Sequence, residues 1–127
     1  MIKVTESEHY IICKEFETVI LLGKRSRKII AIIGDFYGEV EKAVISPDEK
    51  YCAMAGCGII LYYLRAPFTS YAYGKKTVQW KEWWRNGDVW IEDIALQNNI
   101  LIAWTETGEE RRISLDSHPW RHLKFMQ

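Results

Sequence analysis

The chain has 127 residues, which is long enough for one domain whose hydrophobic core needs no metal or disulfide. Hydrophobic residues make up 48% of the chain and charged residues 27%, as in soluble globular proteins. Seventeen basic residues balance seventeen acidic ones, so the net charge favours neither nucleic acid nor anionic lipid as a partner. No apolar run approaches the ~20 residues that span a bilayer.

Three cysteines, Cys13, Cys52 and Cys57, stand at no recognisable framework spacing. An odd number of cysteines in a chain that shows no signal peptide indicates reduced thiols. We therefore expect a cytoplasmic protein. No motif in the sequence indicates a cofactor.

The N-terminal third predicts four short strands, each an apolar or alternating run of branched and aromatic residues. We expect them at Ile2–Thr5, His9–Lys14, Thr18–Gly23 and Ile29–Ile33, the last as a central strand covered on both faces. Four positive charges in Lys24–Lys28 favour a solvated hairpin tip over a phosphate site, because no Gly-rich cradle accompanies them.

The middle of the chain, Ala43–Leu64, predicts a three-stranded antiparallel meander. Pro47-Asp48 ends its first strand, and the Gly56-Cys57-Gly58 turn separates the second from the third. The segment that follows, 65–76, lacks a consistent period and predicts a loop with exposed aromatic residues.

The C-terminal part predicts a strand at Thr77–Arg85, in which Val78 and Trp80 share a face. Asn86-Gly87 is a strong turn signal. A second meander follows, with strands at 88–96, 99–105 and 110–115. The tail, 116–127, predicts one short helical turn or a segment packed across the sheet.

Three segments repeat the pattern of strand, turn and strand: 9–24, 43–64 and 94–115. The matching strands that begin at His9, Lys50 and Asn99 stand at intervals of 41 and 49 residues, and periods of about 40 to 50 residues are typical of propeller blades. Residues 45–64, ISPDEKYCAMAGCGIILYYL, resemble a WD40-type blade. The chain lacks the Trp-Asp and Gly-His pairs of that family, and a propeller needs at least four blades. We therefore predict a single all-β domain over 1–127, with eight to ten short antiparallel strands in an open sheet or sandwich and little helix.

Acidic and tryptophan residues gather around the Asn86-Gly87 turn, and further acids lie at the Thr107-Gly108 turn. On a strand, Trp90 would stand outward between Asp88 and Glu92, away from the core face of Val89 and Ile91. An outward aromatic among acids suits a basic partner with an apolar groove. The candidate partner-binding residues are Asp88, Trp90, Glu92, Asp93, Trp83, Trp84, Glu106 and Glu109.

Other interpretations of these and further residues remain open. The three tryptophans could instead pack under the 65–76 loop, and paired acids beside aromatic residues also occur in glycosidases, which require a deep cleft. Cys57 is the most exposed thiol expected, but it has no neighbouring base in the sequence. His118 and His122 have a zinc-like spacing without the cysteine pair that zinc sites need. We therefore predict neither a catalytic set nor a metal site.

A small β protein with an acidic patch and no catalytic motif resembles the immunity proteins of bacterial contact-dependent growth inhibition. The resemblance implies a cytoplasmic protein that binds a cognate basic toxin domain, such as a nuclease, and blocks it. Its acids would then replace the phosphates that the toxin recognises. The alternatives are a self-assembling β module that completes a larger assembly by edge pairing, as a homo-oligomer, and a protein that binds a small ligand near its tryptophans.

Overall fold

A computed structural model describes residues 1–87 and 89–115 of the chain. The described residues form eleven strands and no helix, which confirms the predicted all-β antiparallel class with one strand more than expected. The strands are β1 (Ile2–Glu6), β2 (Tyr10–Glu15), β3 (Thr18–Gly23), β4 (Ile29–Asp35), β5 (Lys42–Ile45), β6 (Tyr51–Gly56), β7 (Gly58–Tyr63), β8 (Trp80–Trp83), β9 (Ile91–Gln97), β10 (Ile100–Thr105) and β11 (Glu110–Ser114).

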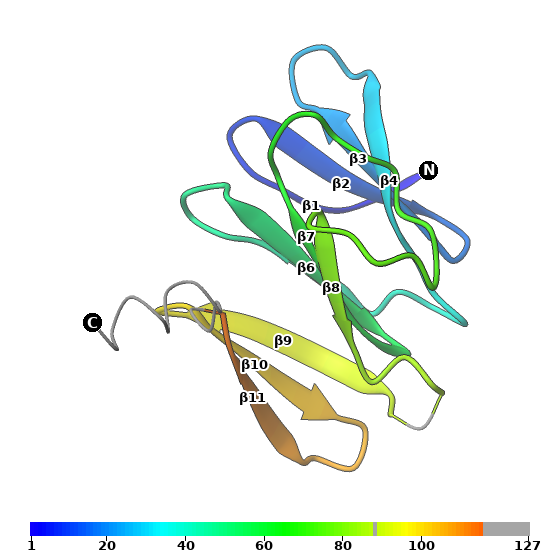
Figure 1. The fold of residues 1–127 in the computed structure, drawn as a ribbon, viewed down its shortest axis with the longest axis vertical. Helices are drawn as coiled ribbons and strands as arrows, with labels where there is room; N and C mark the ends of the chain where they lie inside the picture. The colour runs from blue at the N-terminus through cyan, green and yellow to red at the C-terminus, as the bar shows by residue number, and fades with distance from the viewer. Residues whose placement is uncertain (88, 116–127) are drawn as a thin grey trace.

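The strands form three antiparallel meanders in chain order, seen as successive layers in Figure 1. Sheet 1 holds β1–β4, sheet 2 holds β5–β8 and sheet 3 holds β9–β11, with sheet 2 between the other two. The segments 43–64 and 94–115 cover the first three strands of sheets 2 and 3, and 9–24 covers β2 and β3 of sheet 1. The repeated pattern in the sequence therefore marks the same strands of successive sheets.

Sheet 2 is covered on both faces, because its strands alternate between the two neighbouring sheets. On β6, Cys52 and Met54 face sheet 1, while Ala53 and Ala55 face sheet 3. The strand β7 follows the same rule, with Ile60 and Tyr62 on one side and Ile59 and Leu61 on the other. Each of these eight side chains is at most 1% exposed, so β6 and β7 form the centre of the protein.

Two turns show why the chain carries small or polar residues where it reverses. Asn98 and Asn99 both adopt positive φ, 47° and 64°, as a tight hairpin between β9 and β10 requires. Gly58 has a φ of 87°, and a Cβ at this position would stand only 2.4 Å from the carbonyl oxygen of Trp84. Glycine is therefore required where β7 passes the connection to sheet 3.

The segment between β7 and β8 contains no strand, as predicted, but it fills the space between sheets 1 and 2. The backbone N–H of Tyr71 donates to the Ile32 carbonyl of β4 at 2.8 Å, and its ring lies 5.1 Å from that of Trp80. The expectation of exposed aromatics holds for Tyr73, which is 71% exposed, and is wrong for buried Tyr71. A residue outside any strand is buried here because it closes the core at the open edge of β4.

Three predictions about strand placement are wrong. The strand β4 lies at the edge of sheet 1 rather than at a centre, and Ile29 and Ile32 are 60% and 39% exposed. Val78 precedes β8 and is 79% exposed, whereas Trp80 is buried, so they do not share a face. Asn86-Gly87 does not join paired strands, because β8 pairs with β7 and β9 pairs with β10.

No helix within 1–87 and 89–115 is long and apolar enough to cross a membrane. The predicted helical turn in the tail lies outside the described residues.

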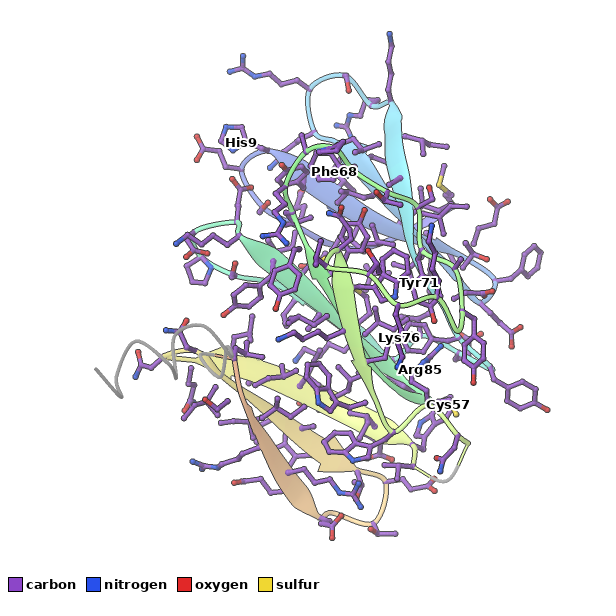
Figure 2. The ribbon with its side chains drawn as sticks, in the orientation of Figure 1. His9, Cys57, Phe68, Tyr71, Lys76 and Arg85 are labelled. Carbon is purple, nitrogen blue, oxygen red and sulfur yellow. The ribbon has the colours of Figure 1, made fainter. Side chains whose placement is uncertain are left out.

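A carboxylate joins sheets 1 and 2 at the end of the molecule that His9 marks in Figure 2. Glu49, in the β5–β6 turn, accepts hydrogen bonds from the Ser7 hydroxyl and from the His9 backbone N–H, the latter at 2.9 Å. The Nδ1 atom of His9 lies 2.6 Å from the other carboxylate oxygen. The bonds from Ser7 and then His9 lower the pKa of Glu49 to about 2, and the bond and charge of Glu49 raise the pKa of His9 above its usual 6.5.

These pKa shifts predict how the pair affects stability. The raised pKa of His9 adds stability that is complete below pH 6.5 and is lost as the pH rises through the folded-state pKa. The lowered pKa of Glu49 adds stability that is complete above pH 4.5 and is lost as the pH falls toward 2. We expect His9→Gln to lower the melting temperature between these limits and to leave it nearly unchanged at about pH 9. An equal loss at both pH values would contradict an ionic contribution.

Candidate functional site

The turns at one end of the three sheets lie together and carry exposed aromatic and acidic side chains. Arg85, from the β8–β9 connection, lies beside Cys57 of the β6–β7 turn at this end (Figure 2). The Trp90 backbone carbonyl accepts from the N–H of Glu106 at 3.1 Å, which joins the β10–β11 turn to the same group. We call this surface the acidic aromatic end and define it by Phe16, Glu17, Asp35, Tyr37, Tyr73 and Glu106.

A cavity of about 300 Å³ opens at the acidic aromatic end. It is lined by residues of four turns and of the 64–79 segment: Glu17, Asp35, Phe36, Tyr37, Cys57, Tyr73 and Arg85. The 64–79 segment follows the edge of β4 past Ile32, and this course brings Tyr73 to the cavity from a part of the chain that begins at the opposite end. The cavity therefore depends on the stacking of sheets 1 and 2 rather than on any one turn.

Arg85 holds the turns around this cavity in place. Its guanidinium donates to the backbone carbonyls of Cys57 at 2.7 Å and of Asp35 at 2.5 Å, and it lies 4.5 Å from the centre of the Phe36 ring. Its Nε donates to Glu82 at 3.0 Å. The arginine side chain is only 12% exposed, so its hydrogen bonds are largely shielded from water. One cation thus fixes the ends of β4, β6 and β8.

Glu82 has a second hydrogen-bond partner in the 64–79 segment, which lies between sheets 1 and 2. The Tyr71 hydroxyl donates to the same Glu82 oxygen at 2.5 Å. Burial raises the pKa of Tyr71, and the bond to Glu82 raises it further. Tyr71 therefore stays protonated and remains a donor throughout the physiological range. Glu82 couples the 64–79 segment to Arg85 and hence to the wall of the cavity.

The acidic aromatic end carries negative charge that no base neutralises within the described residues. Glu17 accepts a hydrogen bond from the backbone N–H of Gly38, but neither it nor Asp35 nor Glu106 takes part in an ion pair there. The positive charge of Arg85 is balanced by Glu82. A basic group approaching this end would therefore meet carboxylates that are free to interact with it.

The predicted tryptophans serve mainly as packing. Trp83 and Trp84 are half-buried against the core between sheets 2 and 3, and not under the 65–76 loop. The guanidinium of Arg111 lies 4.9 Å over the Trp84 ring. Trp90 is also half-buried; it pairs across to Cys57, and its ring lies so close to Gly38 that a Cβ there would stand 3.2 Å away. These rings fill the space between turns, and no one of them stands free as an anchor.

The predicted acids divide into two groups. Asp93 forms an ion pair with Lys42 at 2.7 Å, which lowers the pKa of Asp93, and Glu109 pairs with Arg111 at 2.6 Å. Glu92 and Glu106 are exposed, and Glu106 belongs to the acidic aromatic end. Asp88 lies outside the described residues.

Of the three aromatic residues that stand most freely in solvent at this end, sequence reasoning expected Tyr73 to be exposed and missed Phe16 and Tyr37. Phe16, Tyr37 and Tyr73 are 87%, 85% and 71% exposed. Phe16 and Tyr37 each lie in a turn next to or near an acid, in the stretches EFET and DFYGE, and Phe16 has a positive φ of 57°. The signal available in the sequence was the placement of Phe16 and Tyr37 in turn segments between acids.

Groups with potential catalytic or metal-binding chemistry lie elsewhere or are buried. All three cysteines are buried, and burial strongly raises the pKa of the Cys52 thiol, so this group is a poor nucleophile. The described part of the chain contains no cluster of three potential metal ligands. His118 and His122 lie outside it.

Comparison with known proteins places the chain in no family: no family model matches it, and no curated protein matches it.

The role of Arg85 gives a stability prediction. Arg85→Ala removes charged hydrogen bonds to two carbonyls and leaves Glu82 without its base, so we expect the free energy of unfolding to fall by roughly 2 to 4 kcal/mol. Arg112→Ala is the control, because its side chain is 61% exposed and pairs with an exposed glutamate, a contact that contributes about 0.5 kcal/mol or less. Denaturant titration measures both values. Equal losses of stability in the two variants would show that the hydrogen bonds of Arg85 to the turns do not stabilise the fold.

Proposed function

We propose that this protein is a non-catalytic binding protein whose acidic aromatic end recognises a basic partner protein. The observation that carries the proposal is the exposure of three large aromatic side chains, Phe16, Tyr37 and Tyr73, at the end that also presents unpaired Glu17 and Asp35. Exposed apolar side chains that gather at one place often mark an interaction site, and aromatic residues are frequent anchors of interfaces.

The arrangement suits a protein partner better than a small ligand. Tyr37 and Tyr73 line the cavity, whereas Phe16 lies in the β2–β3 turn and lines a different cavity, so the three rings do not belong to one pocket. A partner could insert one side chain into the cavity while its surface covers the rings. The free carboxylates would speed the encounter with a basic surface and fix its orientation.

The partner class that we propose is a basic toxin domain, such as a nuclease, which makes the chain an immunity protein acting in the cytoplasm. A nuclease surrounds its substrate phosphates with Lys and Arg, and the carboxylates of the acidic aromatic end would occupy these groups in place of phosphate. The support for this class is the group of carboxylates at this end that take part in no ion pair within the described residues, together with the resemblance noted from the sequence.

The proposal predicts a partner that depends on the acidic aromatic end. We expect the tagged protein to capture one basic protein from its native host in equimolar amount, with an affinity that falls as salt is raised. The double variant Glu17→Lys/Asp35→Lys should lose that protein, because reversed charges repel a basic surface. Co-expression with the wild type should relieve any toxicity of the captured protein.

The matched control reverses charge at the opposite end of the molecule. Glu8→Lys changes an exposed acid in the β1–β2 turn and should leave capture unchanged. Capture that survives the Glu17→Lys/Asp35→Lys exchange would refute the site. Capture of a protein whose toxicity the wild type leaves unaltered would refute the immunity function while retaining the binding surface.

A further inference from the structure

A second cavity, of about 540 Å³, opens between sheets 2 and 3 at the end of the strands opposite the acidic aromatic end. Tyr51, Tyr63 and Leu64 line it on the side of sheet 2, and Asn99 and Leu115 line it on the side of sheet 3. Tyr51, Tyr63 and Leu115 also pack against the core between these two sheets. The cavity is therefore the open end of that core, and its volume lies in the range of small-molecule sites.

Two tyrosines form the aromatic wall of this cavity. Tyr51 and Tyr63 are paired residues of β6 and β7, and their rings meet edge to face with centres 6.5 Å apart. Both side chains are half-buried, and Leu64 beside them is buried. Such a wall suits a flat apolar ring, because aromatic rings prefer edge-to-face and offset contacts with one another.

Two basic side chains line the same cavity, and neither takes part in an ion pair within the described part of the chain. Lys50 lies in the β5–β6 turn, and Arg65 follows β7. The guanidinium of Arg65 lies 5.2 Å from the centre of the Tyr63 ring, and its Nη2 donates to the Val78 carbonyl at 2.9 Å. These contacts hold the arginine at the aromatic wall without a carboxylate to balance its charge.

One acid, Asp48, also lines the cavity. Its carboxylate accepts hydrogen bonds from the Ser46 hydroxyl at 2.8 Å and from the Lys50 backbone N–H at 3.1 Å, and these bonds lower the pKa of Asp48. Glu49, the other acid of this turn, is bonded across to sheet 1. The described lining thus holds two cations and one carboxylate that is already hydrogen-bonded, a balance that favours an anion.

We propose that this cavity binds a small ligand that joins a flat aromatic ring to an anionic group. The ring would lie against the tyrosine wall, and a carboxylate or phosphate would accept hydrogen bonds from Arg65 and Lys50. A guanidinium donates two parallel bonds to either group. The site goes beyond the proposed partner binding and is independent of it, because it shares no lining residue with the cavity of the acidic aromatic end.

Two matched pairs of probes test this proposal. Indole-3-acetate and adenosine 5′-monophosphate each carry a flat ring and an anion, and indole-3-acetamide and adenosine are their neutral counterparts. In titrations followed by NMR, the backbone amide signals of Lys50, Leu64 and Arg65 should shift. In at least one pair, the anion should bind about tenfold more tightly than its counterpart, and the pair that does so identifies a carboxylate or a phosphate as the preferred group. Equal binding within both pairs, or shifts confined to other residues, would overturn the proposal.

Variants of the two cations test whether they provide this preference. Lys50→Gln and Arg65→Gln should each weaken binding of the anionic probe about threefold and leave its neutral counterpart unaffected. Lys81→Gln is the matched control, because Lys81 is exposed on β8 and does not line the cavity. The Glu17→Lys/Asp35→Lys protein should also bind the probe, which separates this site from the partner surface. Equal weakening by Lys81→Gln would show that net charge alone attracts the probe and would overturn the site. Circular dichroism verifies that each variant is folded.

Discussion

The structure depends on the need of β6 and β7 to be covered on both faces. Their apolar side chains alternate between the two neighbouring sheets: on β6, Met54 faces sheet 1 and Ala53 faces sheet 3, and on β7, Tyr62 faces sheet 1 and Leu61 faces sheet 3. Neither face can meet water without exposing a continuous apolar surface. Sheets 1 and 3 are therefore held against sheet 2, and the meander order of the chain follows from short turns within each sheet.

The stacking explains why the candidate site lies where it does. Antiparallel meanders place every second turn at the same end of the stack, so residues that are far apart in sequence become neighbours there. Arg85 then joins these turns by donating hydrogen bonds to backbone carbonyls. Because it bonds to carbonyls there, the side-chain carboxylates of Glu17 and Asp35 form no ion pair with it. At the resulting end, turns held by Arg85 surround a cavity that Glu17 and Asp35 line.

Local signals predicted most of the strands and little of their stacking. Alternation and turn residues such as Asn98-Asn99 located most strands within a residue or two, but the strands predicted at 77–85 and 88–96 begin three residues later, at Trp80 and Ile91. The edge position of β4 was missed because an apolar strand has the same sequence pattern at an edge, where Tyr71 covers it, as at a centre. The tryptophans were assigned outward from strand alternation, yet Trp90 precedes β9 and packs on Gly38. Exposed aromatics in turns lack any period, so only the assembled end identifies them.

Hydrogen exchange of the backbone amides tests most directly whether the covered middle sheet holds the fold together. If it does, the amides of β6 and β7 exchange most slowly, at a rate set by unfolding of the whole protein, and those of β11 exchange earlier. The slow group then includes the partners across both interfaces, in β3 and β10. Slower exchange in β2 and β3 than in β6 and β7 would show that sheet 1 folds without sheet 2, and this result would contradict the account.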